Sequence, residues 1–84
     1  MGMSDTTRRQ RIHELDVTVW VGKNGIEPVV DELDGQLDDA EFVKTKFLRA
    51  ARASTTTEDL AAELADHVDA KVVRTRGHTA VFER

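Results

Sequence analysis

The sequence has no cysteine, only one proline, and no long run of apolar residues. The absence of cysteine excludes a disulfide framework, a cysteine-ligated zinc site and thiol catalysis, and it fits a reducing compartment. Because no apolar run approaches the length of a membrane span or a signal-peptide core, we expect a soluble cytoplasmic protein. A chain of 84 residues, 39% of them apolar, predicts one domain over residues 5–84 after a disordered start at residues 1–4.

The net charge is −4, from 12 basic and 16 acidic residues. Taken alone, this argues against nucleic acid as a partner. The charges are segregated, however: the segment Glu27–Glu41 holds seven acids and no base, and Lys44–Arg52 holds four bases and no acid. The abundance of aspartate over lysine also favours the hypothesis of a saline habitat, in which solvated carboxylates keep a surface soluble.

Hydrophobic periodicity predicts the element order α-β-α-β-α-β-β. The expected elements are a basic helix over 5–15, strands at 17–21 and 42–48, helices at 27–39 and from 55 onward, and a hairpin of strands at 71–76 and 79–83. Strands separated by helices favour a right-handed βαβ unit. The predicted fold class is therefore α/β, two-layer or sandwich-like, with a four-stranded mixed sheet.

Two helix starts carry capping signals. Glu27 is expected at the N-cap with Pro28 at the first helical position, where its missing N–H group has no consequence. Thr55, followed three residues later by Glu58, has the spacing of a capping box.

The segment GKNG, formed by Gly22, Lys23, Asn24 and Gly25, joins the first strand to the next helix. A strand-to-helix junction presents amide N–H groups and the positive end of a helix dipole, and glycines let a phosphate approach them. Lys23 adds a mobile charge, and Asn24 either donates to the ligand or supplies a positive φ. A tight turn that needs glycine on steric grounds alone is the alternative, and a GxxG pattern is too short to decide.

Two further sets of residues could contact nucleic acid. Lys44 and Lys46 share one face of their strand, as do Arg74 and Arg76, so either a continuous basic surface or ordinary solvated strand faces would result. Trp20, the single tryptophan, either stacks on an unpaired base or is buried in the core.

The motifs VWVGKNGI, EFVKTKFL and RGHTAVFER occur in this order and spacing. With them the chain resembles the YhbY-like, CRM-domain RNA-binding proteins from about Arg8 to Arg84. The resemblance implies a fold similar to the C-terminal domain of bacterial translation initiation factor 3, and RNA binding through the GxxG loop and the lysines of the second strand. Bacterial members associate with large-subunit ribosome precursors, and plant organellar relatives serve group II intron splicing. Glu83 departs from the pattern, because an aromatic residue is expected there.

We therefore expect an RNA-binding protein that acts on structured ribosomal RNA during large-subunit assembly. No catalytic constellation, metal site or cofactor site is identifiable, so an enzyme is not expected. The alternative is a protein-interaction module that docks a basic partner on its acidic second helix. The residues expected at RNA are Trp20, Gly22, Lys23, Asn24, Gly25, Lys44, Lys46, Arg74 and Arg76, with the footprint extended by Arg8, Arg9 and Arg11.

Overall fold

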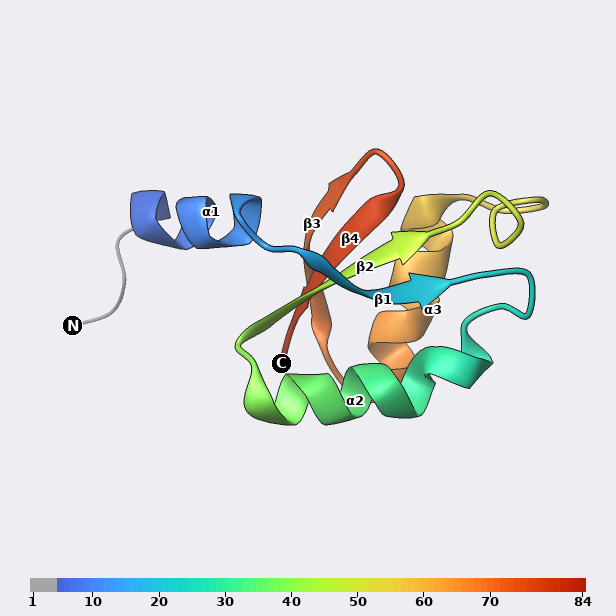
Figure 1. The fold of residues 1–84 in the computed structure, drawn as a ribbon, viewed down its shortest axis with the longest axis horizontal. Helices are drawn as coiled ribbons and strands as arrows, with labels where there is room; N and C mark the ends of the chain where they lie inside the picture. Colours follow the sequence, from blue (N-terminus) through green and yellow to red (C-terminus); the bar gives the residue numbers. More distant parts are fainter. Residues whose placement is uncertain (1–4) are drawn as a thin grey trace.

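The computed structural model of the chain describes residues 5–84, so the disordered start predicted for residues 1–4 lies outside the described residues. The predicted order of helices and strands is confirmed, with one short 3-10 helix (η1) added (Figure 1). The elements are α1 (Asp5–His13), β1 (Val17–Val21), η1 (Glu27–Val29), α2 (Val30–Asp39), β2 (Phe42–Phe47), α3 (Thr57–Val68), β3 (Lys71–Arg76) and β4 (Thr79–Glu83).

The four strands form one mixed sheet in the order β1-β2-β4-β3. β1 and β2 are parallel and are joined through α2, whereas β4 is antiparallel to both of its neighbours. The predicted mixed sheet is therefore confirmed. Within residues 5–84, no helix has both the length and the apolar content needed to cross a membrane.

α2 and α3 cover one face of this sheet and form the main core with it (Figure 1). Val19 and Val21 of β1, Phe47 of β2 and Phe82 of β4 all point into that core and are 0% exposed. Because side chains alternate along a strand, the residues between them face the other way. We call that other side of the sheet the open face.

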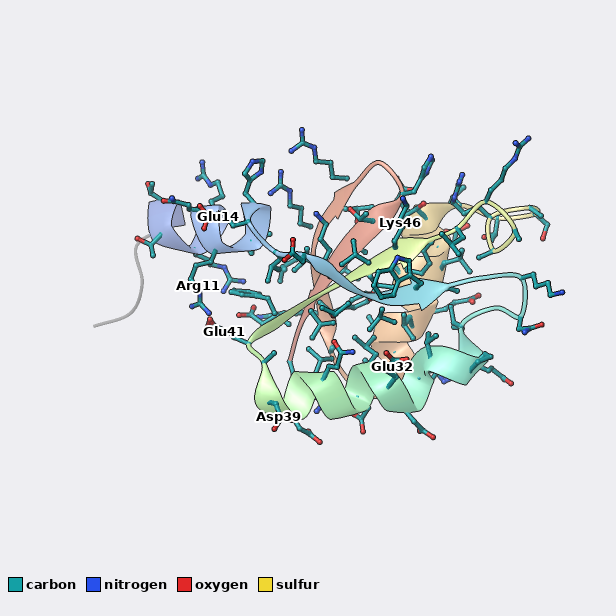
Figure 2. The ribbon with its side chains drawn as sticks, in the orientation of Figure 1. Arg11, Glu14, Glu32, Asp39, Glu41 and Lys46 are labelled. Carbon is teal, nitrogen blue, oxygen red and sulfur yellow. The ribbon has the colours of Figure 1, made fainter. Side chains whose placement is uncertain are left out.

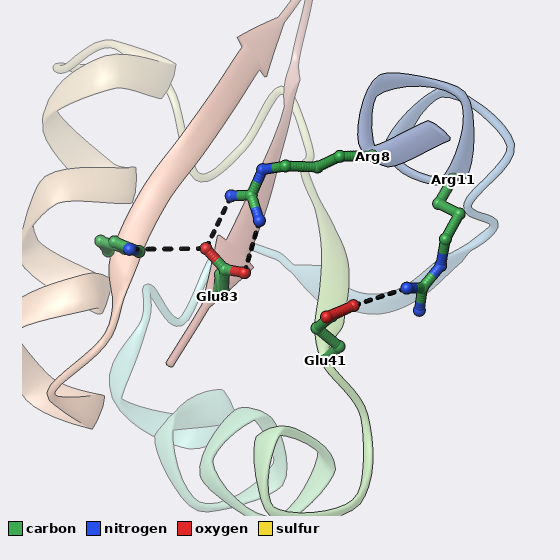
Figure 3. A network of polar contacts seen from close by, with 5 residues as sticks. Arg8, Arg11, Glu41 and Glu83 are labelled. Carbon is green, nitrogen blue, oxygen red and sulfur yellow. Dashed lines mark hydrogen bonds and ion pairs between the residues drawn. The ribbon is translucent and has the colours of Figure 1, made fainter. Parts of the chain in front are cut away.

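Of the helices within residues 5–84, α1 lies against the open face, at one end of it. Ile12 packs there on Phe42 and Val81 in a separate small cluster. Two ion pairs hold the same helix. Arg8 donates two hydrogen bonds of 2.7 Å to the carboxylate of Glu83, and Arg11 donates one of 2.6 Å to Glu41 (Figure 3).

The start of α2 differs from the prediction. Ile26, not Glu27, is the N-cap residue, and a 3-10 helix begins at Glu27 before the α-helix starts at Val30. Pro28 has no N–H group, and Val29 donates to the carbonyl of Ile26 three residues back at 3.0 Å, as in a 3-10 helix. The α-helix therefore starts at Val30, five residues beyond Gly25, and the 3-10 helix lies between the loop and it.

The start of α3 is shifted by one residue. Thr56, not Thr55, is the N-cap, and its hydroxyl accepts a 3.1 Å hydrogen bond from the amide of Asp59. Thr55, Thr56 and Thr57 have the same side chain, so each could cap a helix equally well. Because Thr57 is buried in the first turn, at 4% exposed, the cap is the residue before it, Thr56.

Candidate nucleic-acid interface

Strand register places the predicted basic residues in two adjoining rows across the open face. In the first row Trp20 of β1 pairs with Lys46 of β2, which pairs with Thr79 of β4. Arg76 of β3 completes this row opposite Thr79. The row therefore runs from one edge of the sheet to the other, and Lys46 extends from β2 on the side remote from α2 (Figure 2).

The second row lies one pleat nearer to α1. Lys44 of β2 is opposite Val81 of β4, and Arg74 of β3 is opposite Val81 on its other side. We call the four cations of the two rows the basic face: Lys44, Lys46, Arg74 and Arg76. The structure thus brings together, from two strands separated by β4, the lysine pair and the arginine pair that the sequence indicated.

None of the four cations of the basic face forms an ion pair within residues 5–84. Other bases of the chain behave differently, since Arg8, Arg11, Lys71 and Arg84 each contact a carboxylate within 4 Å. In a chain with more acids than bases, four neighbouring cations left without counter-charges favour a negatively charged ligand.

Trp20 lies on the open face beside Lys46 and is 53% exposed. The interpretation of Trp20 as a buried core residue is therefore wrong. The cause is the alternation of β1: Val19 and Val21 on either side of it fill the core, so the indole must face away. Proteins that bind single-stranded nucleic acid use this arrangement, in which an exposed aromatic ring beside cations stacks on a base.

The GKNG loop is a tight turn closed by a 3.0 Å hydrogen bond from the amide of Gly25 to the carbonyl of Gly22. Gly25 has φ +79°, in the left-handed region that favours glycine. Gly22 has no such requirement, because its φ lies outside that region and an added Cβ would meet only Leu48 Cδ1 at 4.0 Å. The turn therefore requires glycine at position 25, but the fold does not require glycine at position 22.

A second loop lies beside the GKNG loop, because β1 and β2 are parallel and end at the same edge. The amide of Leu48 donates to the carbonyl of Val21 at 2.8 Å, which joins the two loops at their bases. Arg52 is held in this second loop by a 2.9 Å hydrogen bond from its Nε to the carbonyl of Phe47. The carboxyl ends of parallel strands are the usual position of ligand sites in α/β sheets.

Comparisons with known proteins give matches over almost the whole chain. The model of the CRS1 / YhbY (CRM) domain matches residues 4–84. The chain belongs to the CRM-domain family. A relative from Methanocaldococcus jannaschii, named a probable RNA-binding protein, is 38% identical over 76 residues, which are 90% of this chain and 57% of the relative. The chain thus spans little more than half of that protein.

The fold is also found in a solved structure. The solution structure of a hypothetical protein from Staphylococcus aureus, proposed to bind RNA, superposes with a TM-score of 0.74 at 25% sequence identity. The match covers 94% of this chain and 81% of the other. The resemblance to CRM-domain proteins drawn from the sequence is confirmed. The similarity to translation initiation factor 3 stays a prediction.

The N-terminal arginines of this CRM domain have different roles. Arg8 and Arg11 bind Glu83 and Glu41, and both guanidinium groups lie over the ring of Phe42, at 5.0 and 5.4 Å from its centroid. These contacts hold α1 in place. Arg9 is exposed and forms no ion pair in the part of the chain that the structure describes, so it is the one whose position suits an extended RNA footprint.

Glu83 stands at a position where an aromatic residue is expected in a CRM domain. Its carboxylate accepts hydrogen bonds from Arg8, which hold its pKa below the ordinary value, and the nearby charge of Lys71, at 3.5 Å, acts in the same direction. The negative charge that this glutamate brings to the open face is thus neutralised by two bases of the same chain. This pairing could not be predicted from local sequence patterns, because Arg8 and Glu83 are 75 residues apart.

The acidic α2 helix is partly neutralised in the same way. Arg84 contacts Asp34 and lies 2.7 Å from Asp38, and it also donates to the carbonyl of Val68 at 3.0 Å. Two of the acids on the helix expected to dock a basic partner, Asp34 and Asp38, thus have a partner within the chain. The role of Arg84 in joining β4, α2 and α3 was not predicted.

Proposed function

We propose that this CRM domain binds structured RNA through the basic face and the GKNG loop, with Trp20 between them. The observation that carries this proposal is the set of four cations on one sheet face that have no ion-pair partner within residues 5–84. Membership of a family with a relative named as RNA-binding supports it.

Each surface has a distinct role in this proposal. The basic face supplies Coulomb attraction to phosphates, which is independent of base sequence and weakens with salt. The loop supplies amide N–H groups to a phosphodiester that approaches over Gly22, where no Cβ stands in the way. Trp20 stacks on an unpaired base, an interaction of roughly 1–3 kcal/mol. Lys23 and Asn24, both exposed, contact the same phosphate in this proposal.

The RNA proposed is ribosomal RNA of large-subunit precursors. The support is the resemblance of the GKNG and VKTK motifs to those of bacterial CRM-domain proteins, which associate with such particles. Crosslinking in the native cells, followed by sequencing of the attached RNA, tests the assignment. Enrichment of one large-subunit segment is expected, and enrichment of intron RNA instead would replace the ribosomal assignment.

RNA binding itself is tested by a matched pair of lysine substitutions. Lys46 and Lys71 are both exposed residues of the sheet, but Lys71 pairs with Glu83 whereas Lys46 has no acidic partner among residues 5–84. We expect Lys46→Gln to weaken binding of a fluorescent RNA hairpin and to reduce the slope of log K against log salt by about 0.7–0.9, the value of one phosphate contact. Lys71→Gln should leave that slope nearly unchanged. Equal slopes for both variants would contradict the assignment of the basic face.

A further inference from the structure

A cavity of about 270 Å³ lies between the C-terminal end of α1 and the open face of the sheet. Its walls come from α1, from β2 and from the hairpin of β3 and β4. A second hollow, of about 550 Å³, shares Ile12, His13 and Arg74 with it and continues along α1 toward Val73. The basic face therefore ends in a recess and not in a flat surface.

The chemistry of the recess is divided between an apolar floor and a cationic rim. Ile12 and Val81 line the floor, where they are 6% and 2% exposed, and the half-buried Val73 extends the apolar surface into the second hollow. Lys44, Arg74 and Arg76 surround it. An apolar surface next to clustered cations suits a ligand with one flat apolar part and one anionic part. A nucleotide, with its base and its phosphate, has both.

The wall that α1 forms is held in place before any ligand arrives. Arg8 binds Glu83 with two hydrogen bonds of 2.7 Å, and Arg11 binds Glu41 at 2.6 Å (Figure 3). A recess whose walls are fixed by the fold does not need to be ordered on binding, which saves conformational entropy.

We propose that this recess receives a single nucleotide that has left the helical stack, so that the domain prefers RNA with an unpaired nucleotide over an uninterrupted duplex. This inference rests on the proposed function and adds the structural class of RNA. The volume is close to the lower end of the roughly 300–1,000 Å³ range of small-molecule sites, which fits one nucleotide. In an A-form duplex the bases are stacked on one another and the deep, narrow major groove excludes side chains, whereas an unstacked base can be inserted between side chains.

The test uses the full chain and two RNA hairpins that differ only by one bulged nucleotide in the stem. We expect the bulged hairpin to bind about tenfold more tightly, because insertion of one base contributes on that order. His13→Ala and Ile12→Ala should both bring the affinity ratio toward one, and His13→Ala should leave binding of the uninterrupted hairpin unchanged. Thr75→Ala is the control. Thr75 lies between Arg74 and Arg76 in sequence, but it pairs with Ala80, which points into the main core, so Thr75 is on the other face of the sheet from the recess.

His13→Ala protects the test against a loss of folding, because Ile12→Ala removes part of the buried cluster under α1. The side chain of His13 is exposed, so its removal leaves the packing of Ile12 on Phe42 and Val81 intact. A 2-aminopurine base at the bulge gives a second readout, a fluorescence change on binding that His13→Ala should reduce.

Each outcome is decisive. Equal affinity of the unmodified domain for both hairpins, or an unchanged ratio in both recess variants, overturns the nucleotide recess and leaves the proposed function standing. Absence of binding to either hairpin overturns both.

Discussion

Three glycine substitutions can show whether the GKNG loop is only a tight turn or also a site at which a phosphate approaches the backbone. Gly25 has φ +79°, Gly22 does not lie in the left-handed region, and Gly35 lies exposed in α2 with nothing within 4 Å of an added Cβ. Replacement of each by alanine adds the same methyl group in three different settings. Gly22→Ala tests ligand approach, Gly25→Ala tests the turn, and Gly35→Ala is the control.

The expected changes in stability follow from the backbone. An alanine held at the φ of Gly25 costs about 1–2 kcal/mol, which lowers the melting temperature of a domain of this size by roughly 4–16 °C. At Gly22 the methyl group meets Leu48 Cδ1 at an ordinary 4.0 Å, so the stability should change by no more than about 1 kcal/mol. Gly35→Ala should stabilise the helix by about 0.5–1 kcal/mol.

The expected change in RNA affinity has a different order. A methyl group at Gly22 would displace a phosphate from the loop amides, and the loss of one hydrogen bond to a charged group weakens binding by about tenfold or more. Gly35→Ala should leave the affinity unchanged. The assays are thermal unfolding followed by circular dichroism, and fluorescence anisotropy with a labelled RNA hairpin.

One pattern of results would refute the reasoning. If Gly22→Ala binds RNA as tightly as the unmodified domain, no phosphate approaches this residue and the loop is only a turn. A loss of stability at Gly22 as large as that at Gly25 would show that the fold requires both glycines.

Four further outcomes are expected. Glu83→Gln should lower the free energy of unfolding at neutral pH, because the hydrogen bonds from Arg8 lower the pKa of Glu83 in the folded state. This difference from the unmodified domain should shrink as the pH falls below the ordinary 4.5 and through the folded-state pKa, which urea unfolding at several pH values measures. Thr45→Val should raise stability by about 1 kcal/mol in the same assay, since the buried Thr45 hydroxyl has no hydrogen-bond partner among the described residues. RNA should quench the fluorescence of Trp20, and Trp20→Leu should weaken binding about tenfold. The melting temperature should rise steeply from about 0.1 M to molar salt if the acidic composition reflects a saline habitat, and a melting temperature independent of salt would refute that hypothesis.

Strand positions could be predicted because their signal is local. The bounds of β1, β3 and β4 agree with the prediction, and Lys44 and Lys46 lie on the face expected from alternation. Hydrophobic period and turn residues are read within a few positions, so they identify the elements and the face of each side chain. The basic face follows from these two features once the strand order is known.

Other features depend on contacts between distant residues. Arg8 lies close to Glu83 because α1 packs on the open face, and Arg84 lies close to α2 because it follows β4. The recess beside α1 has the same origin, since its lining comes from both ends of the chain. Trp20 was difficult for another reason: an indole in a short apolar strand fits the core by composition, and only the packing of the valines beside it decides.

The position of β4 makes the domain an indivisible folding unit. β4 separates β2 from β3, so without residues 79–83 the sheet would be reduced to one parallel pair and an isolated strand, and two-stranded pairs are marginal in water. Successive residues of β4 also pack on opposite faces of the sheet: Ala80 and Phe82 lie in the main core, and Val81 lies in the small cluster under α1. We therefore expect unfolding in a single cooperative transition, with the slowest amide hydrogen exchange in β4.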